Sequence, residues 1–251
     1  MTGTHREVVP GDRTDSWLVR LDGRDQSHVD LADPTHLAFD YVRRLGDVVD
    51  LHRPAGEPTR VVHVGGAGLT LPRYVAATRP GSWQVVLEPD ETLTALVRER
   101  LPLPRRSGIR VRPTDGLTGI AALRDDCADM VVLDAYDAGR VPAELVTTAF
   151  FADVARVLVP GGWFLLNLSD RAPFAATRDA VAGLRSVFAR TLVAAEPATL
   201  RARRAGNLTV VAGPDDSLAE ALAARAAGGP LAARVLGHDR VSDSFGGGRG
   251  T

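Results

Sequence analysis

The chain of 251 residues is 45% hydrophobic and 24% charged, a composition typical of a soluble globular protein with one sizeable core. Its formal net charge of −1 gives no electrostatic reason to expect a nucleic-acid or membrane partner. All 30 basic residues are arginine, which excludes chemistry that needs a lysine amine.

The first 55 residues predict a small β element followed by a helix, after a polar stretch over 1–15 without a clear element. Ser16–Leu21 alternates between apolar and polar residues as a strand does, and Asp22-Gly23 is a turn signal. Asp33-Pro34 then offers an N-cap and a proline at the first helical position. The helix that follows would carry four apolar residues on one face: Leu37, Tyr41, Leu45 and Val48.

From residue 56 to 235 the chain alternates between strand-like and helix-like segments. The expected strands are 60–64, 84–87, 109–112, 130–133, 163–168, 190–194 and 207–211; the expected helices are 71–78, 91–99, 117–123, 145–158, 174–189 and 218–227. This alternation predicts an α/β domain with a doubly wound, mostly parallel sheet. Seven strands, of which the last two (190–194 and 207–211) follow each other without a long helix between them, favour a seven-stranded Rossmann-like fold. In this fold, of the class I S-adenosylmethionine methyltransferase type, the seventh strand is antiparallel. The end of the chain, 236–251, is predicted to be a flexible tail.

The strongest functional signal is a glycine cluster after the first of these strands. Val61–Gly68 is an apolar run that ends in Gly65, Gly66 and Gly68, and Val85–Glu88 is a second apolar run that ends in a carboxylate. This spacing is typical of a nucleotide-binding βαβ unit, in which glycines let the backbone approach the ligand and the carboxylate binds a ribose diol. The sequence therefore predicts an adenosine-containing ligand.

Further polar residues follow the next strands, where the carboxyl ends of a parallel sheet form the ligand edge. Asp115-Gly116 follows the third strand, Asp134 and Asp137 follow the fourth, and Asn167 and Asp170 lie at the fifth. Each also has a structural interpretation, since Asp115 suits a helix N-cap and the other acids suit a loop cap or a solvated surface. Four successive strands with such residues nevertheless predict one shared site.

Four short motifs share the order and spacing of a known family. They are Leu21-Asp-Gly-Arg-Asp-Gln26, similar to LDGxxQ; Asp115-Gly116; Asp134-Ala-Tyr-Asp137, similar to D-[ST]-x-D; and Val141-Pro-Ala-Glu-Leu145 with Ala149-Phe-Phe151, similar to PAxxL…FY. Together they resemble the polyamine aminopropyltransferases, the spermidine synthase family, over about 21–170.

This resemblance implies transfer of an aminopropyl group from decarboxylated S-adenosylmethionine to a small-molecule amine, with methylthioadenosine as product. Asp134 would attract the cationic amine and take its proton. Asp137 would bind the aminopropyl end or the acceptor ammonium, and Glu88 the ribose hydroxyls. Gln26, Asp115 and Gly116 would contact the ligand, and the resemblance also implies a homodimer.

Departures from the family keep two other functions open. The acid of the family's GGGDGG loop is replaced at Gly68, the residue after the first catalytic acid is Ala135, and the tyrosine of the amine site could be Tyr41 only in a shifted register. The alternatives are a methyltransferase that uses S-adenosylmethionine, with an arginine or backbone amide for its carboxylate, and a non-catalytic homologue that binds a nucleoside or serves in an assembly.

Several features exclude other classes of site. Cys127 is the only cysteine, so no disulfide forms within the chain. The six histidines show no metal-ligand spacing, which predicts no metal, and His63 within a strand is predicted to be a core residue. No apolar run approaches the ~18–20 residues of a membrane span. The start, Met1-Thr-Gly-Thr-His-Arg6, lacks a hydrophobic signal core, so we expect a cytoplasmic protein.

Overall fold

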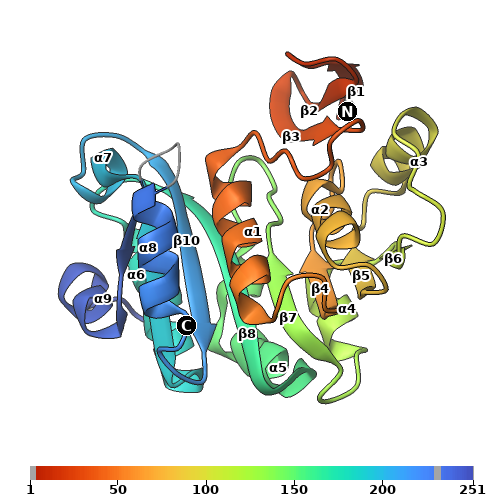
Figure 1. Cartoon of the computed structure of the whole chain (residues 1–251). Coiled ribbons are helices and arrows are strands. Elements are labelled where there is room, and N and C mark those ends of the chain that lie inside the picture. Colours follow the sequence, from red (N-terminus) through yellow and green to blue (C-terminus); the bar gives the residue numbers. More distant parts are fainter. Residues whose placement is uncertain (1–3, 229–232, 251) are drawn as a thin grey trace.

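The computed structural model describes residues 4–228 and 233–250, which form a three-stranded and an eight-stranded sheet with helices on both faces of the larger one (Figure 1). The strands are β1 (Arg6–Pro10), β2 (Ser16–Leu21), β3 (Arg24–Asp30), β4 (Arg60–Val64), β5 (Trp83–Leu87), β6 (Ile109–Arg112), β7 (Ala128–Leu133), β8 (Leu158–Asp170), β9 (Arg190–Ala195), β10 (Gly206–Gly213) and β11 (Arg234–Leu236). The helices are α1 (Asp40–His52), α2 (Thr70–Thr78), α3 (Glu91–Arg100), α4 (Gly116–Ala121), the 3₁₀ helix η1 (Ala143–Val146), α5 (Thr148–Val157), α6 (Ala175–Val187), α7 (Pro197–Leu200), α8 (Ala219–Gly228) and α9 (His238–Phe245).

The large sheet has the strand order β11-β9-β10-β8-β7-β4-β5-β6. The strands from β6 through β8 pair in parallel, whereas β10 is antiparallel to both β8 and β9. This arrangement confirms the predicted doubly wound fold and its antiparallel seventh strand. The sheet has one strand more than predicted, because β11 pairs antiparallel with β9 at the edge.

The central strands are buried on both faces, so helices must cover both sides of the sheet. Every residue of β7 is buried. One face packs against α4, α5, α6 and α9, and the other against α1, α2 and α8. These two apolar layers leave the loops at the carboxyl ends of β4, β5 and β7 as the open edge of the domain.

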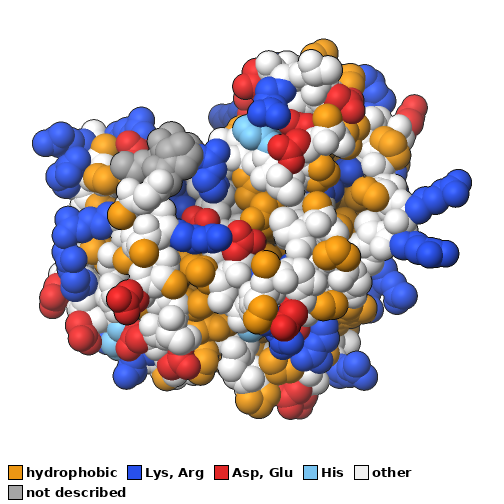
Figure 2. All heavy atoms as spheres, viewed as in Figure 1, with side chains coloured by type: hydrophobic (Ala, Val, Ile, Leu, Met, Phe, Trp, Pro, Cys, Tyr) orange, Lys and Arg blue, Asp and Glu red, His pale blue; other side chains and the backbone are white. Residues whose placement is uncertain are grey.

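The N-terminal β element is a complete antiparallel sheet of three strands. β1 pairs with β2 over 6–10, so part of the polar stretch 1–15 is a strand, contrary to expectation. Val8, Val19 and Val29 from this sheet form an apolar cluster with α3. Figure 2 shows the sheet as a protrusion above the body, with side chains of both charge signs interspersed over the viewed face.

The predicted start of α1 is wrong, because the helix begins at Asp40 and not at Pro34. Asp33 instead caps a local turn, in which its Oδ1 accepts the backbone N–H of Thr35 over 3.1 Å. Asp-Pro is also a turn signal, and here the local turn is the structure that forms. The predicted helix over 145–158 is likewise divided into η1 and α5.

The predicted flexible tail over 236–251 is wrong over 238–245, and Thr251 lies outside the described residues. Helix α9 spans His238–Phe245, and its Val241 and Phe245 are buried in the main core. The ring of Phe245 packs edge-on against Phe174, with centroids 5.6 Å apart. Among the described helices, none has the length and apolar character needed to cross a membrane.

A buried arginine fixes the carboxyl-terminal end of α1. Arg79 is 1% exposed, and its guanidinium donates to four backbone carbonyls, those of Asp50, Arg53, Pro54 and Glu57. The last carbonyls of a helix lack partners within the helix, so this side chain acts as a cap. Because α1 also carries residues that line the cavity described below, Arg79 supports that cavity from outside it.

We predict that Arg79→Met lowers the free energy of unfolding by about 2–4 kcal/mol, because it leaves buried carbonyls without donors. Urea unfolding measures the change. The matched control is Arg98→Met on the exposed side of α3, for which we expect a change within about 0.5 kcal/mol. Equal effects of the two substitutions would contradict the capping role.

Candidate active site

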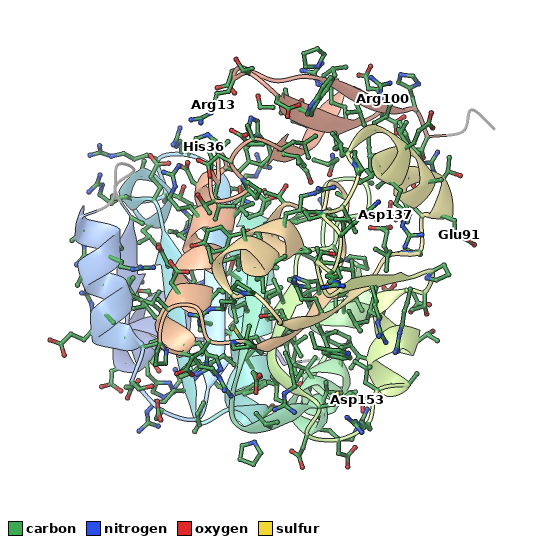
Figure 3. The ribbon with its side chains drawn as sticks, turned by 45° about the vertical axis from the view of Figure 1, so that its right-hand side comes forward. Arg13, His36, Glu91, Arg100, Asp137 and Asp153 are labelled. Carbon is green, nitrogen blue, oxygen red and sulfur yellow. The ribbon has the colours of Figure 1, made fainter. Side chains whose placement is uncertain are left out.

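A cavity of about 750 Å³ opens at the carboxyl ends of β4, β5 and β7, beside the hairpin between β2 and β3. Eight of the eleven residues selected from the sequence line it: Gln26, Gly65, Gly66, Glu88, Asp115, Gly116, Asp134 and Asp137. Gly68 and Asn167 lie behind the lining, and Asp170 instead accepts hydrogen bonds from Thr177 of α6. In Figure 3, Asp137 lies below the small N-terminal sheet and on the same side as Glu91 of α3. The size suits a small-molecule ligand.

The first two glycines are required by close packing around the loop after β4. Gly65 has a φ of +90°, and a Cβ on it would lie 2.4 Å from the carbonyl oxygen of Asp134. A Cβ on Gly66 would lie 2.8 Å from Cγ1 of Val86. At these two positions the loop therefore presents bare backbone to the cavity.

Gly68 does not line the cavity, which corrects its assignment as a ligand-binding residue. Its N–H donates to Oγ of Ser27 over 3.0 Å, and a Cβ on it would lie 2.9 Å from Val29. This glycine therefore allows the N-terminal sheet to pack on the loop, a contact between segments about 40 residues apart that spacing alone does not reveal.

Glu88 connects the end of β5 to the glycine loop. Its Oε2 accepts the N–H of Gly66 over 3.0 Å and that of Ala67 over 3.3 Å, and its Oε1 accepts the N–H of Asp90 over 2.9 Å. A carboxylate has about four acceptor positions. One remains for a ligand hydroxyl, and a diol would also displace the long bond from Ala67.

Asp115 combines a structural role with a place on the cavity wall. Its Oδ1 accepts the N–H of Thr118 over 2.8 Å as the N-cap of α4, and this backbone hydrogen bond lowers the pKa of the carboxyl group. The neighbouring Gly116 is buried, and a Cβ on it would lie 2.4 Å from Val64. The structural interpretation of Asp115 is therefore correct, and it does not conflict with ligand contact.

Asp134 lies where β7 ends and accepts a hydrogen bond on Oδ1 from Nδ2 of Asn167 over 2.9 Å. Burial raises the pKa of Asp134 to about 6, although hydrogen bonds from Asn167 and Tyr41 oppose this rise. Burial also raises the pKa of Tyr41 well above its usual value, so its hydroxyl stays protonated. Asp134 can therefore exchange a proton near neutral pH.

The loop that follows Asp134 forms the outer wall of the cavity. Asp137 is exposed, and its backbone exchanges two hydrogen bonds with Arg140, over 2.8 and 2.9 Å. Arg24 approaches this loop from the N-terminal hairpin, its guanidinium 3.6 Å from the position of a Cβ on Gly139. Gln26 lines the cavity from the same hairpin.

The cavity lining is strongly acidic. Among the described residues it includes one arginine, Arg24, and seven acids: Asp22, Glu88, Asp90, Asp115, Asp134, Asp137 and Glu144. One acid is neutralised, because Arg6 pairs with Asp90 over 2.6 Å. His63 adds no charge, since burial lowers its pKa to about 4. Such a lining attracts cations.

Sequence reasoning placed Asn167 at the sheet edge but missed how it and Tyr41 contact Asp134. Tyr41 was expected in the core, yet it lines the cavity, and His63 lines it as well while it bonds Gln84 over 3.0 Å. One signal was available: the chain has only two asparagines and two glutamines. Gln26 lines the cavity, whereas Gln84 and Asn167 each bond a lining residue. Within the described residues, no cluster of three or more His, Cys, Asp or Glu side chains could hold a metal ion.

Comparison with known proteins gives structural relatives only. No protein-family model and no curated protein sequence matches the chain. A probable spermidine synthase from Corynebacterium glutamicum superposes with a TM-score of 0.89 and 27% identity, covering 100% of this chain and 96% of that chain.

Two more distant structures share the fold. A spermidine synthase in complex with the transition-state analogue AdoDATO has a TM-score of 0.61 at 15% identity, covering 86% of this chain and 72% of that chain. Human methyltransferase-like protein 13 in complex with SAH has a TM-score of 0.56 at 21% identity, covering 84% of this chain and 91% of that chain. Together with the strand order, these comparisons identify the spermidine synthase-like form of the class I methyltransferase fold in this chain.

Proposed function

We propose that the protein is an aminopropyltransferase that moves an aminopropyl group from decarboxylated S-adenosylmethionine to a small amine. The observation that carries this proposal is Asp134, a carboxylate with a pKa of about 6 on the wall of an acidic cavity. The similarity to a probable spermidine synthase over the whole chain supports the same function.

The glycine loop and Glu88 would bind the adenosine part of the donor. The bare backbone of Gly65 and Gly66 permits close approach, and the free acceptor position of Glu88 suits a ribose hydroxyl. Asp115 and Gly116 would contact the base. The donor carries a sulfonium and an ammonium group and no carboxylate, which suits an acid-lined cavity.

The acceptor arrives as an ammonium ion, and Asp134 would take one of its protons. The neutral nitrogen would then form a bond to the propyl carbon next to sulfur while the carbon–sulfur bond breaks, and methylthioadenosine leaves with the electron pair. The product nitrogen is then a secondary ammonium ion with two protons, and it keeps both or releases one to solvent according to pH. Asp134 passes the proton that it accepted to solvent. Asp137, exposed at the entrance, would attract the distal ammonium of a diamine.

Calorimetric titration with decarboxylated S-adenosylmethionine, S-adenosylmethionine and methylthioadenosine tests the donor. We expect the decarboxylated donor and methylthioadenosine to bind more tightly than S-adenosylmethionine, because the methionine carboxylate would face the acidic lining. A screen of diamines and polyamines with the bound donor then tests transfer. Tighter binding of S-adenosylmethionine would contradict the proposal, and no binding of any of the three would favour a non-catalytic homologue.

Asp134→Asn should reduce transfer by at least about 100-fold, the contribution of a general base, while methylthioadenosine still binds. In the wild type we expect kcat/KM to fall as the pH drops through about 6, where Asp134 takes up a proton. Steady-state rates over a pH series measure both effects. Unchanged turnover in the variant would remove Asp134 from catalysis.

The same variant should be more stable than the wild type above pH 6. Because the folded state raises the pKa of Asp134 above its usual value, the ionised form weakens the fold, and this penalty appears as the pH rises from about 4 through about 6. We expect Tm to increase by at least roughly 2–4 °C, because the raised pKa corresponds to more than about 1 kcal/mol and each kcal/mol changes Tm by about that much in a chain of this size. Thermal unfolding at acidic and neutral pH should show the difference at neutral pH alone.

Arg24 favours a second candidate, a methyltransferase that uses S-adenosylmethionine, since a guanidinium in the cavity could bind the methionine carboxylate. Arg24→Gln distinguishes the two. For aminopropyl transfer we expect the decarboxylated donor to bind roughly twofold more tightly, because a like charge is removed from the cavity lining. Loss of about tenfold or more in affinity for S-adenosylmethionine would favour the methyltransferase.

A further inference from the structure

The only two asparagines of the chain are hydrogen-bonded to each other beside Asp134. Asn167 in β8 is fully buried and donates Nδ2 to Oδ1 of Asp134 over 2.9 Å. Its own Oδ1 accepts Nδ2 of Asn207 in β10 over 3.1 Å. The hydrogen bonds therefore run in one direction, from Asn207 through Asn167 to Asp134.

Helix α1 holds both ends of this arrangement. Arg44 donates to the backbone carbonyl of Asn207 over 3.1 Å and to Oγ1 of Thr209 over 3.2 Å, which fixes β10 against the helix. Tyr41, three residues earlier on the same helix face, stabilises the carboxylate of Asp134. The distance between Asn207 and Asp134 is thus set by packed elements.

The direction of the amide pair is tied to the charge on Asp134. An amide side chain has a donor end and an acceptor end of similar size, so it can turn over without a change of shape. The observed direction presents an N–H to Asp134, which stabilises an ionised carboxylate. The reverse direction presents an oxygen, which bonds only to the protonated acid. Because Asn167 is fully buried, an unmatched amide end would be costly.

We propose that Asn207 is a positioning residue that acts through Asn167 to keep Asp134 ready to accept a proton, and that both amides turn over when it does. Its catalytic consequence rests on the proposed function, whereas the coupling itself is a property of the fold. Tyr41 of α1 and Tyr136 of the following loop are the titratable side chains near Asp134. Both remain protonated near neutral pH because burial raises their pKa values.

Selective ¹⁵N labelling of asparagine tests the coupling in the wild-type protein. With two asparagines the spectrum contains two side-chain amide groups, and Asn207→Asp identifies one by its loss. Between about pH 4 and pH 8 we expect the chemical shifts of both amide groups to change. The pH midpoint of this change should equal the midpoint at which the carboxyl carbon of Asp134 titrates. An Asn207 amide that does not respond at that midpoint would overturn the proposal.

Three variants test the direction. Asn207→Asp provides only acceptors and should turn Asn167 toward it, which raises the Asp134 midpoint by about one pH unit and lowers transfer about tenfold below that midpoint. Ser169→Asp is the matched control. Ser169 is exposed and lies opposite Asn207 on the neighbouring strand, so this substitution adds the same charge without touching the amide contact. Asn207→Leu, which removes the contact without a charge, should give an intermediate rise.

Equal shifts in Asn207→Asp and Ser169→Asp would mean that charge alone is responsible, and an unchanged midpoint in Asn207→Leu would mean that the contact is irrelevant. Either result would overturn the proposal. The titration does not require the reaction. Coupled titration without aminopropyl transfer would therefore refute the proposed function and leave the amide coupling standing.

Discussion

The close approach of Gly65 to the backbone of Asp134 is the contact on which the cavity depends. The N–H of Asp134 donates to the carbonyl of Val64 over 2.9 Å, and the N–H of Gly65 donates to that of Leu87 over 3.0 Å. The ends of β7, β4 and β5 are thereby bonded in sequence. A side chain at residue 65 would force them apart. The glycine loop, Glu88 and Asp134 consequently keep their relative positions as one rigid edge.

That rigidity allows the fold to hold a carboxylate in an unfavourable environment. Burial raises the pKa of Asp134 to about 6, so the fold is less stable with the acid ionised than with it protonated. Asn167 and Tyr41 offset part of this cost by hydrogen bonding. Groups with perturbed acidity that line a cavity mark functional sites more often than structural ones, and the rest of the core contains the apolar packing that compensates.

Local patterns were sufficient to predict the order of strands and helices, the glycine loop and the acids at the sheet edge, because each depends on residues close in sequence. Contacts between distant segments were beyond such patterns. Gly68 is a glycine because Ser27 and Val29 pack on it. Helix α9 was hidden in a polar, glycine-rich stretch, where only Val241 and Phe245 face the core. Tyr41 looks like a core residue on a helix wheel, and only the position of α1 brings it to the cavity.

The use of amides around Asp134 follows from the charge of the cavity. An arginine beside this carboxylate would stabilise its ionised form more strongly than an amide, but it would also lower the pKa of Asp134 and reduce the negative charge of the cavity. A neutral N–H from Asn167 stabilises the anion without adding charge to the cavity. It can also reverse direction when the acid is protonated, which an arginine with donors alone cannot do. An amide is therefore a partner that hydrogen-bonds the carboxylate of Asp134 in either protonation state.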